Sequence, residues 1–282
     1  MTASGRVAGW FRGEEFFVIA GPCLLEDDAL NLRIAETLAS FAADAGLAVI
    51  FKASFDKANR SRPDAVRGPG LERGLRLLER VREISGLPVL TDIHEPGQAV
   101  AAAAVCDALQ IPAFLSRQTD LVIAAARTGS PINLKKGQWM APEEMAGAVG
   151  KARDAGASAI AVTERGTFFG YGDLVVDMRS FVRMRSATGA AVVFDGTHSV
   201  QRPGRVDGAS GGDPQFTRPL VLAAVGAGAD GLFLEVHPDP RRAPSDGSNM
   251  LRLDEFRPLL EDVIALREAL GAGVGRAGRT VP

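Results

Sequence analysis

The sequence is poor in several features that would point to particular classes of protein. It holds only 2 cysteines in 282 residues, Cys23 and Cys106, too few for the disulfide framework of a small secreted domain. The formal net charge at pH 7 is −2, which gives no reason to expect binding to nucleic acid or to an anionic membrane. No apolar run approaches the ~20 residues of a membrane span, and the N-terminus lacks the apolar core of a signal peptide. These absences favour a soluble protein of the reducing cytoplasm.

What the sequence does contain is a regular alternation of β-type runs with helical patterns. The runs expected to form strands are 16–21, 49–54, 88–93, 108–112, 131–137, 159–166, 191–199 and 231–240. Several of the helical patterns between them end in glycine, which is typical of a helix C-terminus. Eight strands alternating with eight helices predict a (β/α)₈ TIM barrel. A doubly wound open sheet is the alternative, but the first strand–helix turn, AGPCLLED, has no GxGxxG phosphate loop.

No linker, long repeat or low-complexity tract divides the chain. We therefore expect a single barrel domain over residues 1–282, with a frayed tail at 272–282. In such a barrel the catalytic residues lie at the C-terminal ends of the strands and in the loops that follow them. Three of these loops, 52–70, 196–213 and 237–253, are long enough to suggest a function.

Cations gather at the ends of the expected strands. Lys52 ends the second strand, Arg117 follows the fourth, Lys135 and Lys136 end the fifth, and Arg165 ends the sixth. Strand alternation places Lys135 and Lys136 on opposite faces. The face of Lys136 is otherwise apolar and should meet the helices, so we expect Lys135 and, by the same reasoning, Arg165 to point inward. A lysine and an arginine that converge at a barrel mouth suit a phosphate or carboxylate, although surface charge is the alternative for each.

A second group of residues could bind a metal ion. Cys23 follows the first strand, His198 ends the seventh, Glu235 ends the eighth, and Asp246 lies in the next loop. Strands 1, 7 and 8 are neighbours in a closed barrel, and these donors suit Zn²⁺, Fe²⁺ or Mn²⁺. Cys23 could instead be a nucleophile or a small core residue, and Cys106 is expected to be core.

The two remaining histidines are ambiguous from the sequence. His94, in TDIHEP, is expected to brace its loop before the proline. His237, in HPDP, could line the pocket or brace the loop, and the sequence does not decide between these roles.

Longer motifs place the chain near a known family. The runs GPC, FKASFDKANRS, RGPGLE, TDIHEP, IPAFLSRQTDL, NLKKGQ, FDGTHSVQ, GASGG and EVHPDP occur in that order. From residue 16 to residue 266 this pattern resembles the 3-deoxy-D-manno-octulosonate 8-phosphate synthases. The resemblance implies a barrel enzyme, a transferase, that condenses phosphoenolpyruvate with D-arabinose 5-phosphate. It also implies a homotetramer and a place in the synthesis of the lipopolysaccharide sugar Kdo. The chain departs from the family pattern at Gly196 and at GGDPQFTRPL, which puts the conformation of the seventh loop in doubt.

The resemblance also implies roles for individual residues. Residues that match the family's phosphoenolpyruvate-binding positions are Lys52, Lys57, Lys135 and Arg165, with Asp92 and Gln138 as further pocket residues. Asn59 and Arg60 resemble residues that bind the sugar phosphate, and Arg117 resembles one supplied across a subunit boundary. The implied ligands of one divalent ion are Cys23, His198, Glu235 and Asp246. Cysteine at the first ligand position indicates the metal-requiring branch, because the metal-independent branch carries asparagine there.

The implied chemistry leaves several readings open. Lys57 is a plausible proton donor to the new alkoxide, and Cys23, His198 and Asp246 would act through the metal. The metal could activate water or only position the substrate. A related synthase that makes heptulosonate 7-phosphate or sialic acid remains an alternative, although KANRS argues against the first of these. An imine-forming aldolase that uses Lys135 and a non-catalytic sugar-phosphate-binding barrel are further alternatives.

Overall fold

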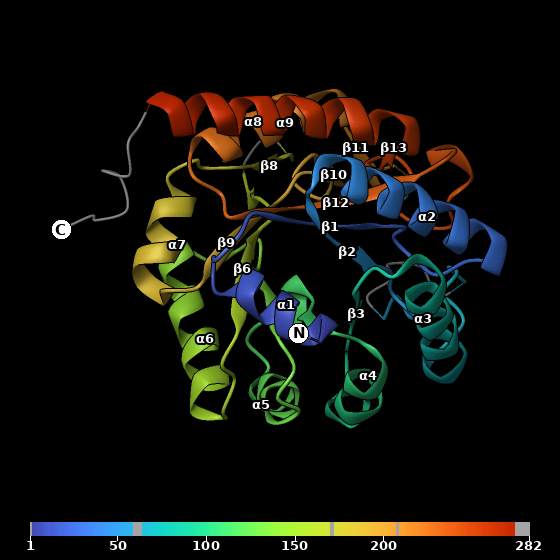
Figure 1. The fold of residues 1–282 in the computed structure, drawn as a ribbon. Coiled ribbons are helices and arrows are strands. Elements are labelled where there is room, and N and C mark those ends of the chain that lie inside the picture. The colour runs from blue at the N-terminus through green and yellow to red at the C-terminus, as the bar shows by residue number, and fades with distance from the viewer. Residues whose placement is uncertain (1, 59–63, 170–171, 207–208, 274–282) are drawn as a thin grey trace.

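Eight parallel strands close into a barrel at the centre of the molecule (Figure 1). The computed structural model describes residues 2–58, 64–169, 172–206 and 209–273. The barrel strands are β1 (Phe17–Gly21), β2 (Ala48–Lys52), β3 (Val89–Asp92), β4 (Ala108–Ile111), β5 (Ile132–Lys135), β6 (Ile160–Glu164), β9 (Ala191–Asp195) and β12 (Gly231–His237). Each pairs with the next, and β12 pairs with β1, with Phe17 opposite Gly231. The predicted fold class is confirmed, and every strand falls within its expected run or one residue outside it.

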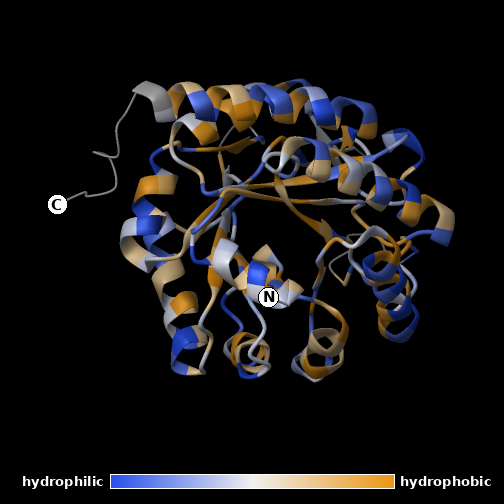
Figure 2. Ribbon diagram, in the orientation of Figure 1, coloured by the Kyte–Doolittle hydropathy of each residue, from blue (hydrophilic) through white to orange (hydrophobic). Residues whose placement is uncertain are grey.

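A ring of helices surrounds the barrel. It consists of α2 (Asp28–Ala45), α3 (Leu71–Ser85), α4 (Ala99–Val105), α5 (Thr119–Arg127), α6 (Met145–Asp154), α7 (Ser180–Thr188), α8 (Thr217–Gly226) and α9 (Leu253–Gly273). Figure 2 shows apolar strands enclosed by helices that carry both hydrophilic and hydrophobic residues. As predicted, α2 and α3 end at glycines in the left-handed conformation, Gly46 and Gly86. Because α9 reaches Gly273, residues 272–273 of the expected frayed tail are helical, and residues 274–282 lie outside the described residues.

An N-terminal helix that the sequence analysis did not predict closes one end of the barrel. This helix, α1 (Ala3–Phe11), lies inside the ring of outer helices (Figure 1). Its buried side chains Val7, Trp10 and Phe11 belong to the same apolar cluster as the inward residues of the strands. The rings of Phe11 and Phe17 lie 5.4 Å apart, centroid to centroid. Since Phe17 begins β1, the plug is at the N-terminal end, and a ligand must enter from the other end.

Near that other end the inward side chains are polar and linked by hydrogen bonds. Ser54 Oγ and Gln110 Nε2 each donate to the Asp92 carboxylate. Asn133 Nδ2 donates to Gln110 Oε1 at 2.8 Å, and Thr163 Oγ1 donates to Asn133 Oδ1 at 2.7 Å. This ladder crosses from Ser54, just beyond β2, to Thr163 on β6 and satisfies groups that would be costly to bury alone. It fixes the floor of the barrel mouth.

The long loops carry secondary structure of their own. Two hairpins, β7 (Thr167–Phe168) with β8 (Leu174–Val175) and β10 (Gln201–Val206) with β11 (Ala209–Gly212), rise from the ends of β6 and β9. A short strand, β13 (Leu251–Arg252), pairs with the end of β12. The 3₁₀ turns are η1 (Pro96–Gln98), η2 (Ala113–Leu115), η3 (Pro142–Glu144), η4 (Pro214–Phe216) and η5 (Pro240–Arg242). Within the described residues, none of the helices has both the length and the apolar character needed to cross a bilayer.

Candidate active site

Charged side chains are buried together at the C-terminal mouth of the barrel. Lys52, Lys135, Arg165, Asp195 and Glu235 are all at least 94% buried, and they come from β2, β5, β9 and β12 and from the end of β6. Burying charge is costly unless partners compensate. Such a concentration at the functional end of a barrel indicates a binding or catalytic site.

Lys135 points into the barrel, as strand parity predicts. Its ammonium Nζ lies 2.6 Å from Asp195 Oδ2 and 3.5 Å from the centroid of the Phe233 ring. Burial lowers the pKa of Lys135, although Asp195 opposes the shift. The lysine is therefore a desolvated cation that a bound anion would stabilise.

Arg165 also points inward and has spare hydrogen-bonding capacity. Its Nη2 donates to Gln201 Oε1 at 2.5 Å, while Nη1 is buried and has no partner among the described residues. Burial lowers the pKa of Arg165, against the opposing charge of Asp195. Gln138 Oε1 is likewise buried without a described partner. Unpaired buried groups of this kind suggest an absent ligand, here one with anionic oxygen for the guanidinium.

Two further lysines face Glu235 on the opposite side of the mouth. Lys52 Nζ lies 3.2 Å from Glu235 Oε1, and Lys57 Nζ lies 3.9 Å from the same oxygen. Burial acts to lower the pKa of Lys57, but Cys23 and Glu235 outweigh it and hold that pKa above its ordinary value. Because its pKa is raised, Lys57 stays positively charged. It becomes a better proton donor only when another cation neutralises Cys23 and Glu235.

Three of the four predicted metal ligands meet beside these lysines. Ligand atoms of Cys23, Glu235 and Asp246 all lie within 4.8 Å of one another. The Cys23 thiol donates to Asp246 Oδ2 at 3.1 Å. The fourth, His198, is next to them, with Nε2 at 3.5 Å from Glu235 Oε2.

The surroundings of these four residues fit a divalent cation. Burial and the Glu235 charge raise the pKa of the Cys23 thiol far above its ordinary value. A thiol in this setting becomes a thiolate only when a cation is supplied, and a bound metal does this directly. Thiolate, imidazole and carboxylate together suit zinc or iron better than magnesium or calcium.

The backbone at Asp246 is strained. Its φ is 53°, the only positive φ among the described residues other than glycine. Ser245 Oγ donates to Asp246 Oδ2 at 2.8 Å, and Gln201 Nε2 donates to Oδ1 at 3.1 Å. Non-glycine residues adopt this conformation at a cost and concentrate at functional sites. The loop therefore places this carboxylate next to Cys23, although doing so requires an unfavourable backbone conformation at Asp246.

Some predicted residues do not join the cluster. Asn59 and Arg60 lie outside the described residues. Arg117 is exposed at the rim, where its backbone carbonyl accepts from Lys151. Asp92 is buried in the polar ladder, 3.9 Å from Lys52 Nζ, and so lies beneath the cations.

The two ambiguous histidines differ in their contacts. His237 Nδ1 accepts from the Asp239 N–H at 3.0 Å, and its Nε2 lies 3.2 Å from Glu26 Oε1. His94 packs edge-on against Phe55, with ring centroids 5.9 Å apart. The contacts of His237 are those of a brace, whereas His94 Nδ1 is buried without a partner among the described residues, so the bracing role of His94 stays a prediction. Cys106 is buried in the apolar cluster between barrel and helices, as expected.

Lys136 pairs with a different carboxylate from Lys135, as expected for side chains on opposite faces of the strand. Its side chain is fully buried, with Nζ 3.4 Å from Glu164 Oε1. The same ammonium donates to the carbonyls of Gly137 and Met140 and to Thr167 Oγ1. It therefore ties the loop after β5 to the hairpin after β6.

Asp195 and Gln201 are site residues that the sequence analysis missed. Asp195 could have been found, because the alternation that turns Lys135 inward also turns Asp195 inward on β9. Gln201 contacts both Arg165 and Asp246, but it lies beyond a turn in a hairpin. No strand periodicity could have placed it.

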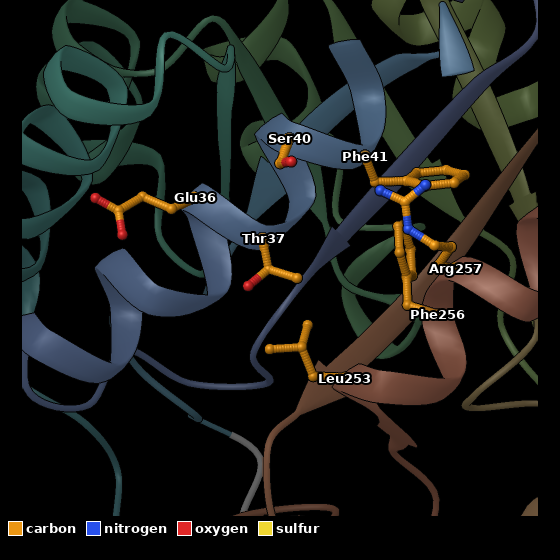
Figure 3. A pocket seen from close by; sticks show the side chains of 7 residues that line it. All are labelled: Glu36, Thr37, Ser40, Phe41, Leu253, Phe256 and Arg257. Atoms are coloured by element: carbon orange, nitrogen blue, oxygen red, sulfur yellow. The ribbon is translucent and has the colours of Figure 1, made fainter. Parts of the chain in front are cut away.

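The outer surface carries a groove that is separate from this site. Its volume is about 370 Å³. Figure 3 shows the side chains that line it, which come from α2 and α9. The guanidinium of Arg257 lies 4.9 Å from the centroid of the Phe41 ring and 2.7 Å from Asp44 Oδ2. None of the predicted site residues lines this groove.

A barrel that gathers buried cations and potential metal ligands at its C-terminal mouth is the arrangement of an enzyme for anionic substrates. The chain belongs to the DAHP synthetase I family, whose sequence model matches residues 7–270.

Curated relatives within this family share one name, 2-dehydro-3-deoxyphosphooctonate aldolase, a synonym of 3-deoxy-D-manno-octulosonate 8-phosphate synthase. The protein of Syntrophotalea carbinolica is 55% identical over 249 residues, which cover 88% of this chain and 90% of the relative. That of Magnetococcus marinus is 53% identical over 88% of this chain and 86% of its own. The protein of Alkalilimnicola ehrlichii is 52% identical over 93% of this chain and 95% of the relative. The resemblance read from the motifs is confirmed.

Proposed function

We propose that this protein condenses phosphoenolpyruvate with D-arabinose 5-phosphate and water. The products are 3-deoxy-D-manno-octulosonate 8-phosphate and inorganic phosphate, in the biosynthesis of Kdo and lipopolysaccharide. The relatives' shared name supplies the substrates. The structural observation that carries the proposal is the buried Arg165, whose Nη1 has no partner in the described residues and which, like the desolvated Lys135, interacts with Asp195 and Glu235.

The proposed binding roles follow from charge. Lys135 and Arg165 hold the phosphate of phosphoenolpyruvate, and Lys52 and Lys57 add positive potential across the mouth. Gln138 lines the same pocket, and Asp92 supports Lys52 from below. Asn59 and Arg60 are proposed to bind the sugar phosphate. Two anionic substrates repel each other, so holding them together calls for several cations at one opening.

The reaction itself needs one carbon–carbon bond and the loss of phosphate. Carbon C3 of phosphoenolpyruvate attacks the sugar aldehyde, and water adds at C2. The resulting tetrahedral intermediate loses phosphate by cleavage of the C–O bond. Lys57 stands on the Glu235 side of the mouth, from which it can stabilise the new alkoxide and, once the acidic groups around it are compensated, protonate it.

We propose that Cys23, His198, Glu235 and Asp246 hold one divalent ion, Zn²⁺, Fe²⁺ or Mn²⁺. When bound, such an ion supplies Lewis acidity and can orient an aldehyde or a water. The four side chains supply the thiolate, imidazole and carboxylates that fix it, and Ser245 and Gln201 hold Asp246 in place.

A homotetramer in the cytoplasm remains part of the proposal. Two features of the rim support association: Arg117 is exposed, and nearby Phe114 and Trp139 are 49% and 45% exposed. The two rings stack with centroids 5.8 Å apart and form an exposed apolar surface, and Phe114 lies three residues before the exposed Arg117. We propose that Arg117 serves the site of a second subunit.

A comparison of aldoses tests the proposed substrate. Phosphate release from phosphoenolpyruvate is measured with arabinose 5-phosphate and with erythrose 4-phosphate. We expect kcat/KM to be far higher with arabinose 5-phosphate, and equal values would reject the assignment in favour of a related synthase. Borohydride trapping in the same assay leaves no reduced adduct unless Lys135 forms an imine. No phosphate release with any aldose would indicate a binding protein.

A further inference from the structure

Asp195 links two parts of the site through a single oxygen. Its Oδ2 accepts from Lys135 Nζ at 2.6 Å and lies 2.7 Å from His198 Nδ1. Its Oδ1 accepts from the backbone N–H of His198 at 2.9 Å and of Thr197 at 3.2 Å. The side chain is fully buried, so water does not reach these oxygens in the structure. The carboxylate is held rigidly between a proposed phosphate-binding lysine and a proposed metal ligand.

We propose that Asp195 is a positioning residue that couples metal binding to anion binding. The inference rests on the proposed function, because its two ends are Lys135 and His198 in their proposed roles. Asp195 touches neither the substrate nor the metal in this proposal. It acts through the side chains that do.

The coupling follows from the shared oxygen. With the Nδ1–H of His198 bonded to Asp195, the ring presents the lone pair of Nε2 toward Glu235 and the other ligands. A carboxylate behind a metal-binding histidine makes it a better ligand. Lys135 competes for the same oxygen, and an anion bound to Lys135 relaxes that competition. Anion binding should then strengthen metal binding, and by reciprocity metal binding should strengthen anion binding equally.

Direct electrostatic attraction between the bound metal ion and the bound anion would also make each strengthen the binding of the other. A matched control variant is therefore needed. Asp92 is another buried carboxylate, in the polar ladder beneath the mouth, and it lies 3.9 Å from the ammonium of Lys52. It bonds to Ser54 and Gln110 and to none of the proposed metal ligands. We call the contact of Lys135 and His198 through Asp195 Oδ2 the bridge. Asp92→Asn removes one buried negative charge and leaves the bridge intact. Asp195→Asn removes one buried negative charge and the bridge together.

The test measures Zn²⁺ affinity with and without saturating sulfate, an unreactive stand-in for phosphate that does not precipitate zinc. Competition with a chelating dye gives the dissociation constants of the wild type, Asp92→Asn and Asp195→Asn. We expect sulfate to tighten Zn²⁺ binding about fivefold or more in the wild type. Asp92→Asn should keep that factor, and Asp195→Asn should bring it close to one.

The outcomes separate this inference from the proposed function. A wild type that binds no Zn²⁺ overturns the metal site and the inference with it. A wild type that binds Zn²⁺ and sulfate independently overturns the inference alone. Equal factors in all three proteins assign the coupling to direct attraction and also overturn it.

A second measurement does not depend on the variant folding. The chain has 3 histidines, so the ring nitrogens of His198 can be assigned by ¹⁵N NMR in the wild type. We expect Nδ1 to carry the proton in the metal-free protein and its signal to move downfield when sulfate is added, as the bond to Asp195 strengthens. A proton on Nε2 instead, or a signal that sulfate leaves unchanged, contradicts the bridge.

Discussion

At the scale of single residues, the environment of Cys23 argues for a ligand and against a nucleophile. A nucleophilic thiol needs a lowered pKa or a base beside it. Cys23 has a raised pKa, and the thiol contacts the Asp246 carboxylate. His198 turns its two ring nitrogens toward Asp195 and Glu235. The same features serve a metal ligand well, since the metal supplies the missing positive charge.

Replacing Cys23 separates these roles. Cys23→Ala should lose bound metal and most activity. Cys23→Asn should also bind metal weakly, because a neutral amide is a poor ligand beside a thiolate. Its N–H can still donate to Asp246, however, and some activity that resists a chelator should survive.

The measurement is turnover of each protein with and without chelator. The wild type should be silenced by the chelator and restored by added divalent ion. Wild-type activity that survives chelation refutes the metal role, and an inactive asparagine variant with full metal content points back to a nucleophile.

Lys135 and Lys136 are adjacent yet should fail in different ways. Lys135→Ala should cost phosphoenolpyruvate affinity or rate by roughly 2–5 kcal/mol, because it removes one partner of a desolvated charge pair. Lys136→Ala should instead lower the free energy of unfolding by about 3–5 kcal/mol, because it strands Glu164 as a buried charge. Denaturant unfolding beside steady-state kinetics distinguishes the two.

The matched control for Lys136 removes its partner as well. Lys136→Met with Glu164→Gln should recover most of the lost stability, since no unpaired charge remains. If Lys136→Ala unfolds like the wild type, the buried pair with Glu164 does not stabilise the fold.

At the scale of elements, the departure from the family pattern at Gly196 is explained by helix α8. A Cβ built on Gly196 would lie 2.7 Å from Val221 Cγ2 and 3.1 Å from Leu234 Cδ2. Val221 directly follows the second departure, the segment GGDPQFTRPL. Gly196 thus packs against the residue that follows the second departure, and its small size lets α8 approach the end of β9.

Gly196→Ala should therefore destabilise the protein. Overpacking of this kind costs about 1–3 kcal/mol. Val221→Ala alone should also destabilise, by opening a cavity, but the double variant should be more stable than the sum of the two losses predicts. A double-mutant cycle of unfolding free energies checks this, and strict additivity would place the clash elsewhere.

At the scale of the whole molecule, the buried carboxylates of the site make the free energy of unfolding depend on pH. Asp92, Asp195, Glu235 and Asp246 are buried, which by itself would raise their pKa values. Lysines and His198 outweigh burial and hold the pKa of each below its ordinary value. In acid the unfolded chain therefore binds more protons than the folded one, and stability falls as pH falls.

The lowered pKa values of these carboxylates define the pH range over which stability is lost. The stabilisation should be fully present above the unfolded-state pKa values of about 4, and it should be lost as the pH falls through the lower folded-state values. Denaturant unfolding of the metal-free protein between pH 7 and about 3 should show this loss. Asp92→Asn should reduce the slope by up to about 1.4 kcal/mol per pH unit, the value for one proton. An unchanged slope would mean that Asp92 titrates alike in both states.

The sequence by itself determined the barrel and most of the mouth. The spacing of β-type runs follows local chemistry, and strand alternation alone turned Lys135 and Arg165 inward. The positions of Cys23 and His198 two or three residues beyond strands β1 and β9, and of Glu235 near the end of β12, were also enough to group them, because parallel strands present all their C-terminal ends at one opening. Helix α1 was not predicted because it is short. Its apolar residues Trp10 and Phe11 are buried only by the end of the assembled barrel, which the local sequence does not show.

Only the tertiary structure decided which of these charges act together. Cys23 and Asp246 are 223 residues apart, and a strained loop backbone brings them within 3.1 Å. Strand alternation places Lys136 only on the face opposite Lys135, but its ammonium binds two loops that no periodicity places. Asp195 joins Lys135 to His198 because β5, β6 and β9 lie side by side in the closed sheet. The physical reason is the same in each case: burial and charge pairing depend on distances between segments, whereas the order of residues along one strand records only which face each side chain takes.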